Sequence, residues 1–200
     1  MMNQYVKMII FVIVMGVFTS ALLVTVEVAT SERIEQNQLA NLYSAVLNAN
    51  NESYTQANLA DVFHDTVEEI EEDGLTFYVH KESGAISYQI EGQGVWGPII
   101  GVLTLEEDFE TIKHITILEQ EETPGLGGVI EQRDYLDNYV GKSMTPSLTI
   151  SRSANMDDDN EVDAIVGGTR TSSNFETIMN EEFQRHQTVF EQLDLSGVMS

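Results

Sequence analysis

Glycine, proline and hydroxyl residues meet in Thr-Pro-Gly-Leu-Gly, residues 123–127 of this sequence, directly after the acidic run 119–122. Pro124 fixes one backbone angle, and the glycines permit conformations that other residues avoid. A loop of this kind exposes N–H groups with no side chain in the way, which suits close approach by a flat ring or a phosphate. An ordinary turn uses the same residues, so composition leaves both interpretations open.

A second stretch with chemical potential is Val-Gly-Gly-Thr at residues 166–169, followed by Thr171 and Ser172. Ser173 and Glu176 have the spacing of a capping box, which predicts a helix that starts just downstream. Bare backbone donors next to the positive end of a helix dipole make a phosphate site. The alternative is a plain loop-to-helix junction.

The third stretch is Gly-Gln-Gly-Val-Trp-Gly, residues 92–97. Glycines on both sides of Trp96 let the backbone bend sharply and leave the indole near a surface. The ring then serves as an aromatic wall against a planar ligand. The alternative is a core tryptophan on a bulged strand, because large aromatic side chains are mostly buried.

Metal and hydrolytic chemistry find no support in the sequence. The acidic residues of segment 157–163 alternate like calcium ligands, but an EF-hand loop needs glycine and glutamate where Val162 and Gly168 stand. The four histidines lack zinc-protease spacing, cysteine is absent, and neither a Gly-x-Ser-x-Gly elbow nor a P-loop occurs. We therefore predict no metal ligands and no catalytic residues, and expect a bound cofactor.

The amino-acid composition limits the classes of partner that we expect this chain to bind. The formal net charge is −24, from 33 acidic and 9 basic residues, and 42% of the residues are hydrophobic. Such a field repels phosphate backbones, so no nucleic-acid binding is expected. It also repels anionic headgroups, so any membrane attachment must use apolar insertion.

The uncharged run Met8–Val26 is nearly long enough to cross a bilayer core as a helix. Lys7 precedes it and Glu27 follows it, which predicts a cytoplasmic N-terminus and an extracytoplasmic main domain. A cleaved signal peptide is the competing interpretation, but its apolar core is usually shorter and ends in a small-residue site. We expect a retained single-pass anchor in the inner cell membrane, with residues 8–26 in the lipid bilayer.

Periodicity predicts an α+β fold beyond the anchor. Helical spacing indicates a helix over residues 31–49 with Ser31 as its N-cap, then a polar segment to Glu72 with a short helix and loops. Strand-like runs at 75–82, 85–92, 94–107 and 111–120 predict an antiparallel sheet. A short helix that ends at Gly141 and a last helix with an apolar face from Phe175 to Leu193 complete the pattern.

These elements suggest a division into a membrane anchor over residues 1–30, a connecting helical segment over 31–75 and one further domain over 76–200. In order along the chain, the sequence carries an anchor helix, GQGVWGPIIG, EETPGLGGVI, YVGK and VDAIVGGTRTS. This series resembles the FMN-binding domain family found in the C subunit of the Na⁺-translocating NADH:quinone reductase, to which the G subunit of the Rnf electron-transport complex is related. The resemblance implies that the domain over residues 76–200 is an FMN-binding domain.

In this family FMN is joined by a phosphoester to a threonine, in a motif close to Asp-x-x-Ser/Thr-Gly-Ala-Thr. Asp163 and Gly167 match it, and Thr169 stands at the modified threonine. Val166 and Gly168 depart from it. Glycine for alanine is a mild change, whereas valine for serine or threonine removes a hydroxyl and puts efficient flavin transfer in doubt.

The resemblance implies an electron-carrying component of a membrane ion-translocating NADH:quinone reductase, with covalent FMN. The residues expected to hold the FMN are Trp96, Glu122, Thr123, Pro124, Gly125, Leu126, Gly127, Gly167, Gly168, Thr169 and Thr171. The expected partners are the other subunits of such a complex and a flavin transferase. The alternatives are a component like the Rnf G subunit, a stand-alone tethered flavoprotein, and a non-redox binding or sensor domain.

Overall fold

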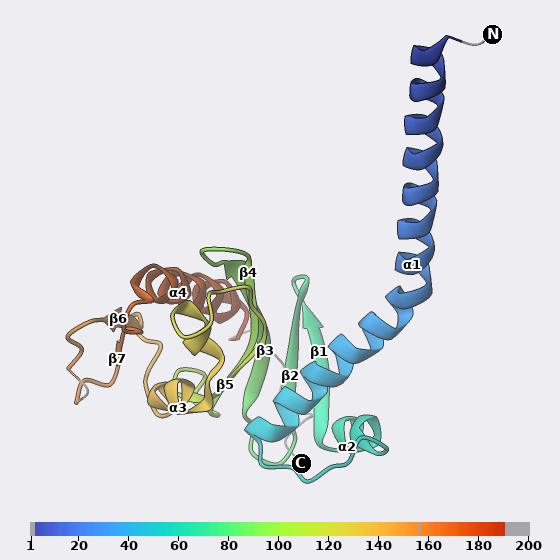
Figure 1. Ribbon diagram of the computed structural model, residues 1–200. Coiled ribbons are helices and arrows are strands. Elements are labelled where there is room, and N and C mark those ends of the chain that lie inside the picture. The colour runs from blue at the N-terminus through green and yellow to red at the C-terminus, as the bar shows by residue number, and fades with distance from the viewer. Residues whose placement is uncertain (1–2, 156, 191–200) are drawn as a thin grey trace. The chain divides into compact units, whose positions relative to one another are not determined.

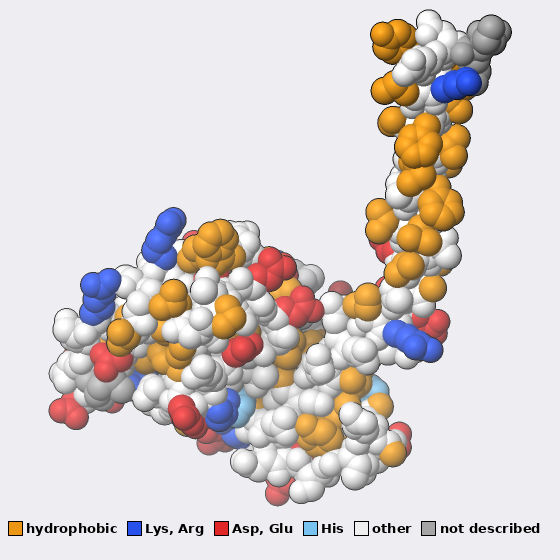
Figure 2. All heavy atoms as spheres, viewed as in Figure 1, with side chains coloured by type: hydrophobic (Ala, Val, Ile, Leu, Met, Phe, Trp, Pro, Cys, Tyr) orange, Lys and Arg blue, Asp and Glu red, His pale blue; other side chains and the backbone are white. Residues whose placement is uncertain are grey.

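The computed structural model of the chain describes residues 3–155 and 157–190 (Figure 1). Its contacts divide the chain into two compact units, Met1–Ala40 and Asn41–Ser200. Helix α1, Gln4–Ala49, belongs to both units, and by length and composition it can cross a membrane, with a mean hydropathy of 2.7 over its most apolar stretch. Figure 2 shows hydrophobic side chains along the visible face of its N-terminal part.

The helix expected from residue 31 does not begin there. Ser31 lies inside α1, and its hydroxyl donates to the carbonyl of Val28 at 3.3 Å. The N-cap prediction was wrong because nothing between the apolar run and the amphipathic stretch interrupts helical backbone. The segment between them contains neither proline nor glycine, so α1 continues through it.

The second unit is built on a five-stranded sheet in the order β1-β2-β3-β4-β5, with every neighbouring pair antiparallel. The strands are β1 Val67–Glu72, β2 Leu75–His80, β3 Ile86–Gln93, β4 Pro98–Leu105 and β5 Ile112–Glu119. The helices are α2 Leu59–Thr66, η1 Gly127–Glu131, α3 Arg133–Leu136, η2 Asp137–Tyr139 and α4 Thr169–Phe190. The α+β prediction is therefore confirmed.

Two pieces of sheet were missed. Residues 67–72, expected in a helix-and-loop segment, form β1, and a short parallel pair joins β6, Thr149–Ser151, to β7, Glu161–Asp163. In β1 the apolar residues Val67 and Ile70 are three apart, a spacing typical of a helix. Its strand form depends on full pairing with β2 around the Asp73-Gly74 turn, where both residues have positive φ.

Both faces of the sheet are covered. On one face α4 packs its apolar residues against β2, β3 and β4, and Phe77 and Tyr88 are fully buried there. On the other face Phe63 of α2 stacks on Tyr43 from the end of α1, with ring centroids 3.8 Å apart. The same Phe63 ring meets Tyr78 of β2 at 5.8 Å. The sheet is thus a rigid support for the loops at its ends.

Helix α4 starts earlier than its sequence predicts. Thr169 is its first residue and Ser173 lies one turn inside, so the capping-box prediction was wrong. The carboxylate of Glu176 instead accepts the backbone N–H of Ile150 at 2.5 Å, which ties β6 to the helix. Leu193, expected on the apolar face, lies outside the described residues. Gly141 follows η2 with a φ of 82°, as expected for a glycine that ends a helical segment.

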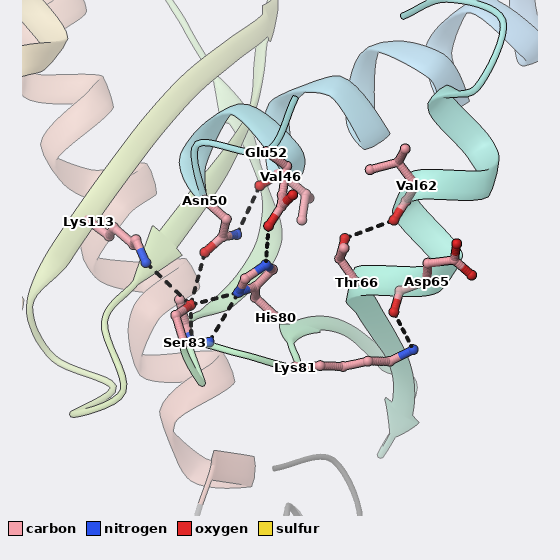
Figure 3. Close-up of polar contacts among 11 residues, drawn as sticks. Val46, Asn50, Glu52, Val62, Asp65, Thr66, His80, Lys81, Ser83 and Lys113 are labelled. Carbon is pink, nitrogen blue, oxygen red and sulfur yellow. Dashed lines mark hydrogen bonds and ion pairs between the residues drawn. The ribbon is translucent and has the colours of Figure 1, made fainter. Parts of the chain in front are cut away.

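A partly buried polar cluster around the buried His80 joins the segment after α1 to the sheet (Figure 3). The two ring nitrogens of His80 lie 2.9 Å from the hydroxyl of Ser83 and 3.1 Å from the carboxylate of Glu52. Asn50 accepts from Ser83 at 3.1 Å, and the ammonium of Lys113 donates to the same hydroxyl at 3.4 Å. We call these five residues the His80 cluster. It fixes the chain after α1 against the turn between β2 and β3.

Candidate functional site

Segments far apart in the sequence meet around a cleft of about 260 Å³. The contributing segments are the β3–β4 loop, the loop between β5 and η1, the residue after β6 and the start of α4. The lining residues are Val95, Trp96, Glu122, Thr123, Leu126, Gly127, Arg152, Gly167, Gly168, Thr169, Arg170 and Thr171. The structure therefore brings together most of the residues that the sequence singled out.

The β3–β4 loop presents Trp96 to solvent. The N–H of Gly94 donates to the carbonyl of Gly97 at 2.9 Å and closes a tight hairpin. The indole at its tip is 70% exposed, so Trp96 is a surface residue and the core interpretation is ruled out. An exposed indole beside a cleft offers a flat apolar wall.

The Thr-Pro-Gly-Leu-Gly loop is a compact turn with one side on the cleft. The carbonyl of Thr123 accepts the N–H groups of Leu126 and Gly128 at 3.1 and 3.0 Å. Gly125 has a φ of 75° and open space where a side chain would lie. Neither Pro124 nor Gly125 is among the cleft-lining residues, whereas Thr123, Leu126 and Gly127 are. The loop is both a turn and one wall of the cleft.

Glu122 ties the cleft segments together. Its side chain is 5% exposed. One carboxylate oxygen accepts the N–H groups of Val95 and Trp96 at 2.6 and 3.3 Å. The other accepts the hydroxyl of Thr171 at 2.6 Å. Three hydrogen bonds to one buried carboxylate hold the β3–β4 loop, the β5–η1 loop and the first turn of α4 in fixed positions.

Two glycines leave room for this carboxylate. A Cβ at Gly94 would lie 2.6 Å from an oxygen of Glu122. A Cβ at Gly127 would collide with the other oxygen of Glu122 and with the hydroxyl of Thr171. These positions require glycine because of close approach, and both glycines belong to the motifs that the sequence highlights. Their purpose is to admit Glu122 as much as to expose backbone.

The start of α4 is held by Ser172. Its hydroxyl accepts the N–H of Ile165 at 3.0 Å and donates to the carbonyl of Gly168 at 3.1 Å. Gly167 takes a φ of 82°, which lets the chain turn into the helix. Thr169 becomes the first helical residue, where backbone N–H groups have no carbonyl partner within the helix. The loop-to-helix junction is thus at the cleft.

Two arginines at the cleft were missed by the sequence analysis. The guanidinium of Arg152 donates to the hydroxyl oxygen of Thr169 at 2.5 and 3.2 Å. Arg170 also lines the cleft, and within the described chain neither arginine forms an ion pair. A signal was available, because basic residues are scarce in this chain and Arg170 directly follows the Gly-Gly-Thr motif.

Apolar side chains surround the cleft opening. Of the cleft-lining residues, Trp96 and Leu126 are the exposed large apolar ones, with Leu126 46% exposed. Val166 precedes the cleft-lining Gly167 in the sequence and is 94% exposed. The side chain of Val166 therefore lies in solvent, and a hydroxyl at this position would have no buried partner to satisfy. The departure of Val166 from the family motif leaves the packing of the domain unaffected.

The chemistry of this site is that of an anion-and-ring binder. A phosphate is favoured by the N-terminus of a long helix and by two guanidinium groups that have no carboxylate partner among the described residues. Exposed Trp96 and Leu126 favour a flat, largely apolar group next to it. Among the described residues no group of three or more potential metal ligands occurs. The residues present therefore fit a flavin mononucleotide.

Comparison with known proteins agrees with this geometry. Residues 94–183 match the sequence profile of the family described as FMN-binding domain. The predicted resemblance is confirmed. Over 86 residues the chain is 36% identical to the C subunit of the Na⁺-translocating NADH-quinone reductase of Haemophilus ducreyi, covering 40% of this chain and 34% of that protein. It is 35% identical over 94 residues to the same subunit of Neisseria meningitidis, covering 44% and 36%.

Solved structures of the C subunit share the fold of about three quarters of this chain. The crystal structure of Shewanella oneidensis NqrC superposes with a TM-score of 0.65 at 21% identity, covering 76% of this chain and 95% of that one. The structure of the C subunit from Parabacteroides distasonis gives 0.62 at 22% identity, covering 74% and 92%. The aligned region spans about a third of the length of the curated relatives named above.

Proposed function

We propose that this protein is the FMN-carrying component of a membrane NADH:quinone reductase of the Na⁺-translocating type, and that it relays electrons without substrate chemistry of its own. The single observation that supports this most directly is the cleft itself. An FMN-binding sequence match, a helix N-terminus, two arginines and an exposed indole coincide there. The names of the relatives supply the class of complex.

In this proposal Arg152, Arg170 and the backbone N–H groups at the start of α4 would hold the phosphate of FMN. Trp96 and Leu126 would contact the ring, and backbone N–H groups of the cleft loops would be available to its polar edge. The bound flavin supplies reversible one- and two-electron transfer. The chain contributes orientation and a fixed set of dipoles and charges, which set the reduction potential.

We further propose that the FMN is covalently joined through the Thr169 hydroxyl. Thr169 lines the cleft, and its hydroxyl oxygen accepts two hydrogen bonds from Arg152. A guanidinium beside the acceptor oxygen attracts the phosphate of the incoming flavin and offsets the negative charge of the resulting diester. A flavin transferase would make the bond from a flavin phosphoanhydride: the Thr169 hydroxyl would lose its proton, its oxygen would bond to the FMN phosphorus, and the anhydride bond would break with release of the other phosphate. The other subunits of the complex would be the electron donor and acceptor.

The apolar run near the N-terminus indicates where in the cell the protein lies. We propose that residues 8–26 lie in the inner cell membrane, with a cytoplasmic N-terminus and an extracytoplasmic domain, from the charges that flank the apolar run. Protease added to intact spheroplasts should digest the domain. Digestion of the domain only after lysis would show that it lies in the cytoplasm, the opposite of the proposed orientation.

The test of covalent attachment is intact mass of protein purified from membranes that contain the transferase. One added FMN is expected, and it should be lost in Thr169→Ala. The matched control is Thr177→Ala, an exposed hydroxyl further along α4. In-gel flavin fluorescence after denaturation gives the same answer. Fluorescence that persists in Thr169→Ala would contradict the assignment, and a protein with neither covalent nor bound flavin would favour a non-redox domain.

A further inference from the structure

Strands β2 and β3 are paired along only part of their length. These strands are paired at Tyr78–Ser87 and Val79–Ile86, next to the turn that connects them. In contrast, β3 pairs with β4 from Ile86–Leu105 to Gln93–Pro98. Toward the tip of the β1–β2 hairpin, β2 separates from β3 (Figure 1). We call the opening between residues 74–76 and residues 89–91 the seam.

The register identifies the backbone groups that face the seam. The N–H of His80 donates to the carbonyl of Ala85, so these residues form a bonded pair. Hydrogen-bonded pairs recur at every second position of an antiparallel ladder, so Tyr78 and Ser87 form the next such pair. If the ladder continued, Thr76 and Gln89 would form the pair after that. The ladder stops before them. Within the described chain, the N–H and C=O groups of both residues are left facing the opening.

The seam coincides with a cleft of about 300 Å³. Its lining residues are Gly74, Leu75, Thr76, Tyr78, Gln89, Glu91, Glu182, Arg185 and His186. The ring of Tyr88 stacks on that of His186 at 4.0 Å. The Tyr88 hydroxyl is buried and has no hydrogen-bond partner in the described structure. Unmet hydrogen-bonding capacity thus lies both along the seam and beneath it.

Charge indicates what kind of partner the seam would accept. The hairpin beside it carries an exposed acidic run formed by Glu68, Glu69, Glu71, Glu72 and Asp73. Glu91 adds an exposed carboxylate on the opposite side of the opening. The one guanidinium among the described lining residues, on Arg185, is paired with Glu182 at 3.5 Å. The seam is therefore an open strand edge in a negative field.

We propose that the seam binds an extended, lysine- or arginine-rich segment of a partner protein by strand addition. Main-chain groups of the segment would pair with Thr76 and Gln89, and its basic side chains would meet the acidic hairpin. A second copy of this chain is a poor occupant because its net charge is −24. This inference is independent of the bound flavin, since the seam shares no lining residue with the FMN cleft among those the structure describes.

The test uses the full chain in detergent micelles and fluorescent peptides of alternating lysine and valine, with alternating glutamate and valine as the comparison. Gln89→Pro removes the N–H that faces the seam. It disrupts no existing ladder bond, because bonds to β4 come from the neighbours Tyr88 and Ile90. Gln89→Ala keeps the N–H and is the matched control.

The basic peptide should bind, the acidic one should not, and Gln89→Pro should weaken binding about tenfold while Gln89→Ala leaves it unchanged. Amide exchange at Gln89 should slow when the basic peptide is present. Equal binding of both peptides, or equal affinity of the proline and alanine variants, would overturn the proposal. Concentration-dependent dimerisation that Gln89→Pro abolishes, without peptide binding, would overturn it in favour of a second copy as the occupant.

Discussion

Glu122 and His80 are each a buried side chain at the centre of a hydrogen-bond cluster that joins separate segments, yet the two clusters hold different segments in place. Glu122 fixes two loops and a helix start, and its partners include the backbone N–H groups of Val95 and Trp96. His80 fixes the chain after α1 to a β-turn through the carboxylate of Glu52 and through Ser83, whose hydroxyl and backbone N–H both contact the same ring nitrogen (Figure 3). The first cluster borders the cleft that contains two arginines, whereas the second connects α1 to the sheet.

The comparison teaches that a buried acid–hydroxyl or acid–histidine cluster is not by itself a sign of function. In isolation, the Glu52–His80–Ser83 series looks like a catalytic relay. What distinguishes Glu122 is its surroundings: glycines that admit the carboxylate, an exposed indole and basic groups. The following predictions test whether the two clusters differ as this assignment requires.

The largest effect is expected from Glu122→Ala. It leaves the N–H groups of Val95 and Trp96 and the hydroxyl of Thr171 without their acceptor. Orphaned buried donors are costly, so the free energy of unfolding should fall by about 3 kcal/mol, and flavin loading should fall with it. Chemical denaturation and flavin absorbance measure both. Glu121→Ala, at an exposed neighbour, is the control, and similar behaviour of the two variants would remove Glu122 from its central role.

His80→Ala should destabilise the domain by about 2 kcal/mol, because the ring is buried and bonds to Glu52 and Ser83. Unlike Glu122→Ala, it should leave the flavin spectrum and loading unchanged in the folded protein. Glu82→Ala, an exposed residue in the same turn, is the control. A changed flavin spectrum in folded His80→Ala would mean that the clusters are coupled.

Gly125→Val tests the wall formed by the Thr-Pro-Gly-Leu-Gly loop. A side chain at a φ of 75° costs about 1–2 kcal/mol, although it would meet open space. The strain should shift the loop, and with it the flavin spectrum or reduction potential, while attachment at Thr169 persists. Gly128→Ala, where φ is not positive, is the smaller companion change. Folded Gly125→Val with an unchanged spectrum and potential would make the loop only a turn.

The smallest effect concerns pH. Burial lowers the pKa of His186, with a further contribution from the charge of Arg185, against the raising effect of its bond to the carbonyl of Glu182. The unfolded histidine takes up a proton near pH 6.5, whereas the folded one resists it, so stability falls as pH drops below about 6.5.

The substitution His186→Phe keeps an aromatic ring against Tyr88. The loss in free energy of unfolding between pH 7.5 and pH 5.5 should become smaller by about 1 kcal/mol or less. Denaturation midpoints at each pH measure it. His64→Gln, at an exposed histidine, is the control for the loss of a histidine. An identical slope for wild type and His186→Phe would show that another group is responsible.

The sequence by itself determined the long apolar helix near the N-terminus, the α+β class, four of the sheet strands and the motifs that border the cleft. These follow from local rules: an uncharged run of bilayer length, alternating β-branched residues, and glycines next to Trp96 and Thr169. Such signals belong to a residue and its near neighbours. They therefore do not depend on how the chain packs.

Only the tertiary structure decided which residues meet. Val67 and Ile70 have helical spacing, but pairing with β2 makes that segment a strand. Ser173 and Glu176 have a capping pattern, but Ser172 holds the turn before α4 and Glu176 bonds to β6. Arg152 lies 17 positions from Thr169, and Glu122 lies 49 positions from Thr171. Contacts at such separations depend on how the sheet and α4 pack, because no local pattern specifies which distant partner will satisfy a buried polar group.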